Sequence, residues 1–253
     1  MSPTRPEVLA LVPARGGSKG IPRKNLLPVA GRPLIAYPIA TALASRHVTR
    51  TLVSTDDAEI ASVSRALGAE VPFLRPAEYA TDTATDLDLF RHALTWLREH
   101  EGYTCDLVVH LRATAPVRRV AVVDEAIDRM LATPDADALR SVSRPHQSPF
   151  KMWRIVDGWL DPLVQAPGVR EAHSQPRQVL PDVFWQNGYV DIIRPRAVLE
   201  LGLIAGNRVL PFIIDEPSPE VDYVEDIPVL EAALEAVARG ERPGGRPGDR
   251  HPT

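Results

Sequence analysis

The stretch from Leu11 to Asn25 reads LVPARGGSKGIPRKN, and the rest of the chain is organised around it. An apolar run precedes it and an amphipathic segment begins near Pro33, which predicts a strand, a glycine-rich loop and a helix in this order. The loop contains three glycines and four cations, namely Gly16, Gly17, Gly20, Arg15, Lys19, Arg23 and Lys24. Glycines let the backbone approach a ligand closely, and exposed N–H groups beside fixed cations bind anions. We therefore expect the loop to bind a polyphosphate; a basic surface turn, the alternative, needs neither the glycines nor the strand.

Length and charge narrow the class of protein. The 253 residues suit one α/β domain with an insertion, and the net charge of −4 gives no reason to expect binding to nucleic acid or membranes. No apolar run is long enough to span a bilayer, and the first residues lead straight into a strand, so we expect a cytoplasmic protein without a signal peptide. The proline- and glycine-rich residues 241–253 are expected to be disordered.

Strand and helix patterns alternate along most of the chain. The predicted strands are residues 7–14, 51–55, 70–74, 106–111, 138–142, 184–193 and 209–214, and the predicted helices are 34–44, 57–67, 86–98, 120–131 and 224–237. This alternation predicts an α/β fold with a doubly wound, mostly parallel, Rossmann-like sheet in a domain of residues 1–240. Ligands of such sheets bind at the carboxyl ends of the strands, where the glycine-rich loop also lies.

The alternation breaks at about residues 143–188. The segment HQSPFKMWRIVDGWLDPLV, residues 146–164, combines prolines, aromatic residues and an Asp-Gly pair, which predicts a twisted hairpin. We expect these residues to form an insertion that leaves the sheet and returns to it. An aromatic-rich insertion is a candidate subunit interface, and the alternative is a lid that packs on its own sheet.

The loop fits neither of two common phosphate-binding motifs. A Walker A loop requires G-x-x-x-x-G-K-[ST], whereas Lys24 is followed by Asn25, and the adjacent Gly16 and Gly17 do not fit G-x-G-x-x-G. Residues 14–25, ARGGSKGIPRKN, instead resemble the signature of the CMP-sugar-acid synthetases, the acylneuraminate and ketodeoxyoctonate cytidylyltransferases. The resemblance implies a sheet of the nucleotidyltransferase type whose loop holds the triphosphate of CTP.

The resemblance places the nucleotide at two segments. In the family, the matching arginine, lysine and asparagine of the loop contact the nucleotide. Residues 73–86, FLRPAEYATDTATD, resemble a second signature that contacts cytosine, and a guanidinium with backbone groups can read that base. The residues expected to bind the nucleotide are Ala14, Arg15, Gly16, Gly17, Lys24, Asn25, Arg75 and Ala84. The alternative for the end of this segment is a simple helix cap by Thr85 or Asp86.

Acidic residues gather at 215–226, after the last predicted strand. Glu220 and Asp222 lie on one side of an extended segment, and magnesium is commonly bound by one or two carboxylates with phosphate and water. The resembled family has a magnesium-binding aspartate–x–aspartate pair here, whose first member Glu220 replaces. We expect Mg²⁺ as the cofactor at these two residues and Arg15, Lys24 and Asp222 as the catalytic groups; the alternative is a solvated acidic turn.

The acceptor segment is expected at residues 110–119, HLRATAPVRR, which resemble the family's leucine–glutamine–proline–threonine–serine–proline–x–arginine run. Arg112 replaces the glutamine and adds a guanidinium, which can bind a carboxylate or a phosphonate bidentately. The alternative is a surface arginine in a basic loop. Two later segments, at residues 176–178 and 185–189, follow the family's order. The residues expected to bind the acceptor are Arg112, Thr114, Arg177, Gln178 and Asn187.

These features predict a cytidylyltransferase that transfers CMP from CTP to a 2-keto-3-deoxy sugar acid of the sialic type and releases pyrophosphate. The added cation at Arg112 also supports a second acceptor, a small phosphonate acid of a biosynthetic pathway. A non-catalytic CTP-binding relative and an NTP-sugar pyrophosphorylase are further alternatives. In the resembled family the insertion forms a dimerisation subdomain whose tip reaches the partner's active site, so we expect a homodimer.

Overall fold

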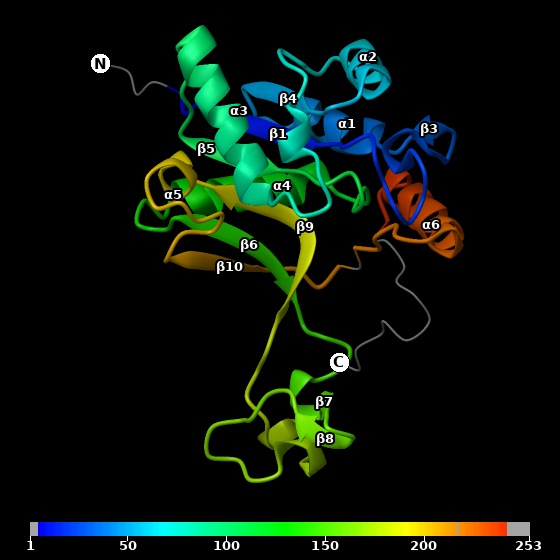
Figure 1. The fold of residues 1–253 in the computed structure, drawn as a ribbon, viewed down its shortest axis with the longest axis vertical. Helices are drawn as coiled ribbons and strands as arrows, with labels where there is room; N and C mark the ends of the chain where they lie inside the picture. The colour runs from blue at the N-terminus through cyan, green and yellow to red at the C-terminus, as the bar shows by residue number, and fades with distance from the viewer. Residues whose placement is uncertain (1–4, 217, 242–253) are drawn as a thin grey trace.

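The computed structural model describes residues 5–216 and 218–241. The predicted disorder of residues 241–253 therefore lies outside the described residues, except at Glu241. Within the described part, the chain forms a central sheet covered by helices, with a small lobe that extends from one edge of the domain (Figure 1).

The sheet has six strands in the order β10 (Val209–Ile213), β6 (Ala138–Ser143), β9 (Trp185–Ile193), β5 (Leu107–His110), β1 (Val8–Pro13) and β4 (Arg50–Ser54). Only β9 runs antiparallel to its neighbours among these strands. The prediction of a mostly parallel α/β sheet is thus confirmed. The carboxyl ends of β1, β4, β5 and β6 lie along one edge, which is where a ligand site is expected.

Alternation within the central strand divides the core into two layers. In β1, Val8, Ala10 and Val12 face a cluster with α1 (Ala36–Ala44), α2 (Ala58–Ala66) and α4 (Val120–Leu131). Leu9 and Leu11 face the other cluster, with α3 (Asp86–Glu101) and α5 (Pro195–Leu199). A buried strand with apolar residues on both faces requires this cover on both sides. No helix in the described ranges has the length and apolar character needed to cross a bilayer.

Local caps fix where the helices near the ligand edge begin. The Asp57 side chain accepts hydrogen bonds from two backbone N–H groups of α2. Thr85 and Asp88 form a reciprocal capping box at the start of α3, and Gly102 ends that helix with φ of 63°. The capping box confirms that Thr85 caps a helix, and it holds the first turn of α3 at the ligand edge.

The chain after β1 differs from the expected loop and helix. A 3₁₀ turn and a small hairpin, β2 (Pro28–Val29) with β3 (Arg32–Pro33), come before α1. A third apolar cluster joins this hairpin to α6 (Ile227–Ala238). The predicted strand at residues 70–74 is wrong, because only Glu70 forms a bridge, to Leu52. Short 3₁₀ turns occupy Lys24–Leu26, Ala77–Tyr79, Pro149–Lys151, Ala172–Ser174, Arg177–Val179 and Val224–Asp226.

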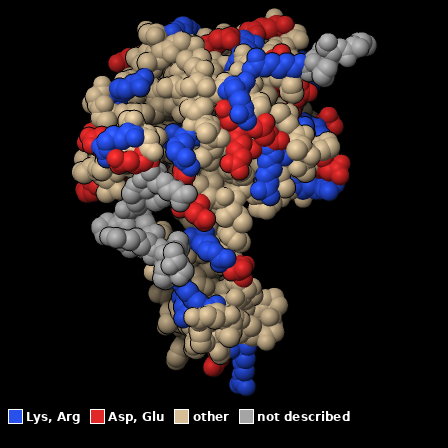
Figure 2. All heavy atoms as spheres, turned by 180° about the vertical axis from the view of Figure 1, so that it is seen from behind, with Lys and Arg blue, Asp and Glu red and all other residues tan. Residues whose placement is uncertain are grey.

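The lobe comprises residues 144–184, between the end of β6 and the start of β9. It contains the hairpin β7 (Trp153–Val156) and β8 (Trp159–Pro162). Asp157 and Gly158 join these strands with φ of 50° and 85°, which is the conformation that an Asp-Gly turn favours. The lobe has a small core of its own, around Phe150. Seen from behind, its surface is mostly neither acidic nor basic (Figure 2).

Candidate active site

A cavity of about 440 Å³ opens at the carboxyl ends of β1 and β5. It is bounded by three of the segments that the sequence singled out: the glycine-rich loop, the segment before α3 and the segment after β5. The lining residues that the sequence predicted are Arg15, Lys24, Asn25, Arg75, Ala84, Arg112 and Thr114. Residues separated by about a hundred positions in sequence thus share one cavity.

Carboxylates of the protein itself hold the exposed cations of the loop. The Arg15 guanidinium donates to the carbonyl oxygen of Thr81 and pairs with Asp82, both at 3.1 Å. Lys19 pairs with the same carboxylate at 2.8 Å. These cations hold the pKa of Asp82 below its ordinary value, chiefly through the hydrogen bond from Lys19. Sequence reasoning missed Asp82, although it lies in the ATDTATD run of the second signature.

Lys24 is the buried cation of the site. Its Nζ atom donates to the carbonyl oxygen of Val221 at 2.8 Å and to Asp222 Oδ1 at 3.1 Å. Only 9% of Lys24 is exposed, so the charge is held in one place rather than in solvent. The loop also packs directly on this segment, since a Cβ atom at Gly20 would lie 2.6 Å from the carbonyl oxygen of Asp222. Lys24 therefore joins the loop to the predicted metal segment.

Other residues of the loop shape its backbone. The Asn25 side chain donates to the carbonyl oxygen of Arg15 at 2.9 Å, and the Gly16 N–H donates to Asp56 at 3.0 Å. Ala14, Gly16 and Gly17, which were expected to bind the nucleotide, do not line the cavity in this structure. Ala14 is instead buried under the loop and pairs with β4 through its N–H group.

Arg23 has a structural role in the described part of the chain. Its guanidinium pairs with Asp57 at 3.1 Å and with Glu59 at 2.6 Å, which ties the loop to the start of α2. The hydrogen bond that Arg23 donates to Asp57 raises the pKa of Arg23. Of the four loop cations, Arg15, Lys19 and Lys24 remain at the cavity.

Arg75 lies under the segment that resembles the cytosine signature. Its guanidinium donates to the carbonyl oxygens of Ser54 at 2.9 Å and Tyr79 at 3.2 Å, while Nε has no partner. Burial lowers its pKa. A hydrogen bond at 3.0 Å from the Ala84 N–H to Thr81 Oγ1 closes the turn above it. Arg75 and Ala84, both expected to contact the base, thus both line the cavity.

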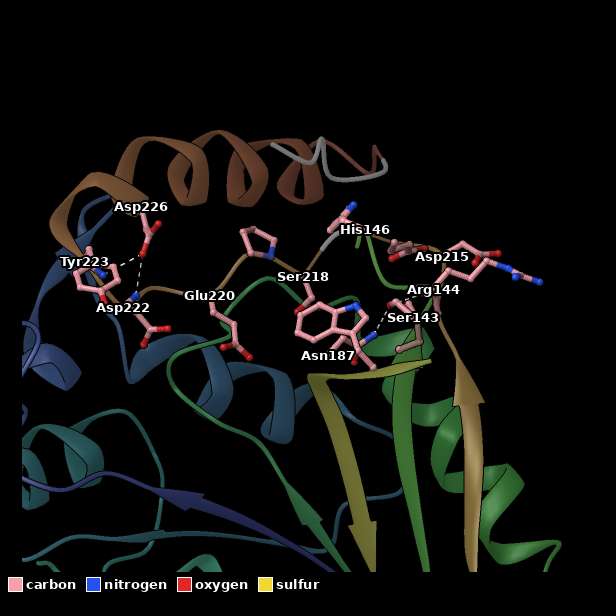
Figure 3. Close-up of a pocket in the computed structure, with 14 residues that line it drawn as sticks. Ser143, Arg144, His146, Asn187, Asp215, Ser218, Glu220, Asp222, Tyr223 and Asp226 are labelled. Carbon is pink, nitrogen blue, oxygen red and sulfur yellow. Dashed lines mark hydrogen bonds between the residues drawn. The ribbon is translucent and has the colours of Figure 1, made fainter. Parts of the chain in front are cut away.

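A second cavity of about 370 Å³ lies beside the first (Figure 3). Its lining includes Ser143, Asn187, Asp215, Glu216, Glu220, Asp222 and Tyr223. Burial, and then the neighbouring charge of Asp222, raise the pKa of Glu220. The two cavities meet at the pair of Lys24 and Asp222, because Lys24 lines the first and Asp222 lines the second.

Glu220 and Asp222 fit a magnesium ion that keeps oxygen ligands from phosphate and water. Within residues 5–216 and 218–241, no group of three acidic, histidine or cysteine side chains is arranged to hold a metal. Magnesium needs no such group, since one or two carboxylates with substrate phosphates suffice. Burial and the charge of Asp222 raise the pKa of Glu220, and a divalent cation bound between the two carboxylates would offset this repulsion. Figure 3 shows both side chains below the segment that leads into α6.

Thr114 and Asn187, two residues predicted to bind the acceptor substrate, form hydrogen bonds that fix the backbone around this junction. The carbonyl oxygen of Thr114 accepts a hydrogen bond from the Val221 N–H at 2.9 Å. The side chain of Asn187 is buried, donating to Ser143 Oγ at 2.7 Å and accepting from the Tyr189 N–H at 3.1 Å. Gly188 has φ of 66°, and a Cβ atom there would lie 2.6 Å from Glu220 Oε1. Asn187 therefore shapes the second cavity by fixing the bulged start of β9.

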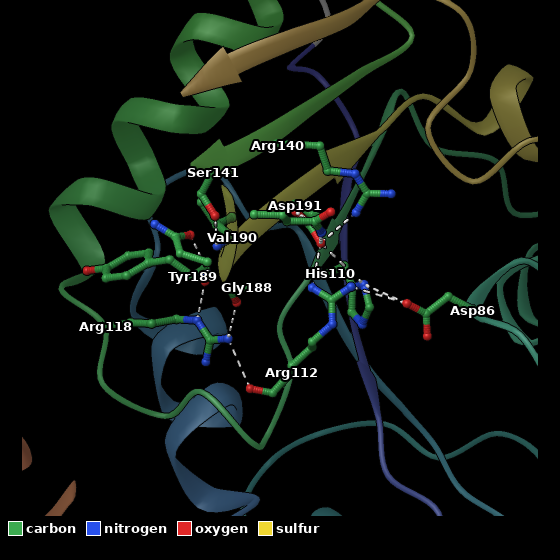
Figure 4. A network of polar contacts seen from close by, with 12 residues as sticks. Asp86, His110, Arg112, Arg118, Arg140, Ser141, Gly188, Tyr189, Val190 and Asp191 are labelled. Carbon is green, nitrogen blue, oxygen red and sulfur yellow. Dashed lines mark hydrogen bonds and ion pairs between the residues drawn. The ribbon is translucent and has the colours of Figure 1, made fainter. Parts of the chain in front are cut away.

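A row of polar side chains crosses three strands beneath the first cavity (Figure 4). The register places His110 of β5, Asp191 of β9 and Arg140 of β6 opposite one another, above the apolar row of Val108, Ile193 and Ala138. Asp191 is fully buried and pairs with Arg140 and Arg112, each at 2.5 Å. Sequence reasoning missed His110 and Asp191, because the pairing of distant strands brings them together.

The charge of Arg112 is already matched by carboxylates. One Nη atom pairs with Asp191, and the other donates to Asp86 at 3.2 Å. Behind it, the buried Arg118 donates to the carbonyl oxygens of Arg112 and of Tyr189. Burial lowers the pKa of Arg118 to about 10. Arg112 thus lines the first cavity as part of a buried network rather than as a free surface cation.

The two remaining predicted acceptor residues lie in the lobe. Arg177 donates to the carbonyl oxygen of His146, and it lines a smaller hollow of the lobe with Arg144 and Asp182. Neither Arg177 nor Gln178 lines the two larger cavities. Within one chain the structure therefore separates these residues from the other predicted site residues.

Comparisons with known proteins find relatives over most of the chain. A family model described as cytidylyltransferase matches residues 9–152, which span the loop, residues 73–86 and residues 110–119. Post-translational flagellin modification protein B of Campylobacter coli is 30% identical over 228 residues, 89% of this chain and 94% of that protein. N-acylneuraminate cytidylyltransferase A of Danio rerio is 32% identical over 225 residues, 88% of this chain and 50% of that enzyme.

The fold has a close counterpart among solved structures. The structure of CMP:2-keto-3-deoxy-manno-octonic acid synthetase complexed with CTP superimposes with a TM-score of 0.67 at 16% identity, covering 92% of this chain and 99% of that chain. At this identity the likeness shows the nucleotidyltransferase fold alone. Together with the family match over more than half of the chain, it leads to one conclusion. The chain belongs to the acylneuraminate cytidylyltransferase family and is a CTP-dependent nucleotidyltransferase.

Proposed function

We propose that the protein transfers CMP from CTP to a 2-keto-3-deoxy sugar acid of the sialic type and releases pyrophosphate. The observation that carries this proposal is the junction of two cavities at Lys24 and Asp222. CTP occupies the larger cavity, with its base towards Arg75 and Ala84 and its phosphates towards the loop. The sugar acid occupies the smaller cavity, so the α-phosphorus and the attacking oxygen meet at the junction.

The residues of the junction provide charge and position. An acceptor hydroxyl oxygen forms a bond to the α-phosphorus and loses its proton to water, the bond to the β-phosphate oxygen breaks, and pyrophosphate leaves with the electron pair. Arg15 and Lys24 hold the phosphates and match the negative charge that grows on the leaving group. Asn187 and Gly188 fix the wall of the acceptor cavity, which limits the directions from which the oxygen can approach. Magnesium held by Glu220 and Asp222 would supply further positive charge at the phosphates.

The surroundings of Arg112 favour a sugar acid over a small phosphonate. A phosphonate carries more charge than a carboxylate and would need an unmatched cation, whereas Arg112 is paired with Asp191 and Asp86. The relatives with printed acceptors are also named for sugar acids, including N,N'-diacetyllegionaminic and pseudaminic acids. We therefore place the phosphonate second.

Pyrophosphate release with CTP, Mg²⁺ and a panel of acids tests the proposed function. The panel contains nonulosonic acids of the sialic type, ketodeoxyoctonate and small phosphonates. We expect release with a nonulosonic acid and identification of the CMP-linked product by mass spectrometry. Release only with a phosphonate would overturn the acceptor assignment. CTP binding without release from any member would contradict the catalytic proposal.

We also propose that the lobe pairs two copies of the chain. The hairpin exposes a run of large apolar side chains, among them Ile155 at 77%, Trp159 at 79% and Leu160 at 63% exposed. A monomer rarely exposes a continuous apolar patch of this kind. The charged residues of the two strands, Arg154 and Asp161, pair with each other. Pairing through the lobe would also bring Arg177 and Gln178 towards the partner's acceptor cavity, where the sequence predicted their role.

Replacing Trp159 with aspartate should convert the dimer into a monomer. The substitution places a charge in the middle of the apolar surface, where desolvating it would cost several kcal/mol and remove the drive to associate. Light scattering coupled to size-exclusion chromatography measures the mass, with Glu99→Gln on exposed α3 as the control. A wild-type protein that elutes as a monomer at micromolar concentration would contradict the interface.

A further inference from the structure

The carboxylate of Asp86 is a hydrogen-bond acceptor inside the larger cavity. It is the first residue of α3, which the capping box at Thr85 fixes in place. Its side chain is 41% exposed and lines the cavity next to Ala84 and Arg75. Among the described residues, only its Oδ2 atom is engaged by another side chain, at 3.2 Å from Arg112 Nη2. The other carboxylate oxygen remains available to a bound molecule.

A buried network holds this carboxylate rigidly. Arg112 bridges Asp86 to Asp191, and Asp191 is in turn held by Arg140 and by the amide of Gln186 at 3.1 Å (Figure 4). Asp191 is fully buried, whereas Arg112 and Asp86 are partly exposed to the cavity. A planar guanidinium between two carboxylates orients both of them more firmly than a flexible cation would. The position of Asp86 is therefore set by residues on β6 and β9.

The neighbouring imidazole adds no charge to this corner of the cavity. His110 is fully buried, with Nδ1 at 4.0 Å from the carboxylates of both Asp86 and Asp191. Burial, together with the nearby charge of Arg112, holds the pKa of His110 well below its ordinary value. Its neutral ring leaves Asp86 as the charged acceptor at this end of the cavity.

Arg75 supplies the matching donor. It is 6% exposed, and its Nε atom has no hydrogen-bond partner. A buried donor without a partner is costly, so a ligand that supplies an acceptor is favoured there. Beside the exposed loop cations and Asp82, which pair with one another, the cavity thus offers the Arg75 donor and the Asp86 carboxylate acceptor.

This pair of groups matches one pyrimidine. Cytosine presents the 4-amino group as a donor and N3 and O2 as acceptors. Uracil presents O4 as an acceptor in place of the amino group, and its N3 carries a proton. A carboxylate cannot donate to O4, and the two oxygens would repel each other. A fixed carboxylate beside a fixed guanidinium therefore distinguishes the two bases.

We propose that Asp86 accepts a hydrogen bond from the 4-amino group of cytosine and that Arg112 is the positioning residue that holds Asp86 for this contact. Because the role presupposes that the larger cavity binds CTP, it rests on the proposed function. It assigns Arg112 to nucleotide selection through Asp86, rather than to direct contact with the acceptor. A purely structural role for Asp86, as a charge at the start of α3, would leave the choice of base unaffected.

The test compares CTP and UTP binding by titration calorimetry, with Mg²⁺ and without an acceptor. In Asp86→Asn, the amide can donate to O4 of uracil, so we expect the CTP-to-UTP affinity ratio to fall by about tenfold to a hundredfold, the value of a hydrogen bond to a charged group. Arg112→Gln should reduce the ratio in the same direction but less, because Asp86 stays and only loses its anchor. Glu99→Gln removes a carboxylate from an exposed position later in the same helix, outside the cavity and away from the capping box, and should leave the ratio at the wild-type value.

The outcomes separate this role from the proposed function. An unchanged ratio in a folded Asp86→Asn protein that still binds CTP would overturn the role of Asp86, even if the enzyme releases pyrophosphate. A fall in the ratio of equal size in Glu99→Gln would also overturn it, since a general effect of charge on α3 would then suffice. A wild-type protein that binds CTP but is inactive with every acid contradicts the proposed function and leaves the ratio measurable. Circular dichroism and melting curves confirm that each variant is folded.

Discussion

Replacing Lys24 with methionine should lower kcat/KM for CTP by about a hundredfold to a thousandfold, the usual cost of losing one preorganised group that stabilises a transition state. Lys24 is buried and aimed at the junction by the carbonyl oxygen of Val221 and by Asp222. Methionine keeps most of the length and volume of the side chain but removes the charge. The loss should appear in kcat as well as KM, because charge grows on the phosphates as the bond to pyrophosphate breaks.

A second lysine of the same loop provides the control. Lys19 is 76% exposed at its side chain and pairs only with Asp82 among the described residues. Lys19→Met makes the identical chemical change in a solvated position, so its effect should stay within a few-fold. Steady-state pyrophosphate release measures both variants. Equal losses in the two variants would show that the loop acts through its net charge, and the special placement of Lys24 would then be refuted.

The contrast between Lys24 and Arg23 shows what the loop sequence can and cannot reveal. In the sequence alone, nothing distinguishes the roles of two adjacent cations in one glycine-rich loop. The resemblance singled out Arg15 and Lys24, and the structure places both at the cavity. Arg23 is turned away because its φ of 55° directs it to Asp57 and Glu59 at the start of α2. That direction depends on where α2 begins, which no local pattern in the loop encodes.

The sheet was predictable where the signal is local. Apolar runs such as Val8 to Pro13 determine β1, and the Asp157-Gly158 pair determines the turn between β7 and β8. The segment at residues 70–74 has the same apolar character but forms only a bridge at Glu70. It lies beyond β4, at the edge of the sheet, where no further strand continues the ladder. The structure of residues 70–74 therefore depends on which strands are available for pairing, and not on the composition of the segment alone.

The polar network under the cavity was not predictable from one sequence. His110, Arg140 and Asp191 are spread over more than eighty residues and meet only because β9 inserts antiparallel between β5 and β6. The alternation rule does place them on the same face as the apolar residues two positions away. It gives no register between strands, so it cannot show that the carboxylate lies opposite two cations. The sequence therefore predicted that Arg112 binds the acceptor substrate, and only the structure shows that it pairs with Asp191 and Asp86.

Replacing Asp191 with asparagine should destabilise the protein by about 3–5 kcal/mol, as expected when one member of a buried ion-pair network is removed. Asp191 is fully buried and neutralises parts of Arg112 and Arg140. Asparagine has the same shape, so the packing of β9 is kept and the loss is electrostatic. Two guanidinium groups would then remain in the sheet interior with Asp86 as the nearest carboxylate. Urea unfolding followed by circular dichroism measures the change in the free energy of unfolding.

A variant of an exposed ion pair tests whether the loss of stability in Asp191→Asn comes from burial or from the loss of a charge alone. Arg144 and Asp182 pair at 2.7 Å at the surface of the lobe, with side chains 55% and 71% exposed. Asp182→Asn removes a carboxylate from one arginine in solvent and should hardly change the urea midpoint, because exposed pairs contribute little. A similar midpoint shift in both variants would contradict the assignment of the cost to burial. If the shift is confined to Asp191, adding Arg140→Met to the Asp191→Asn background should recover part of the stability, since one of the two unpaired buried charges is then gone.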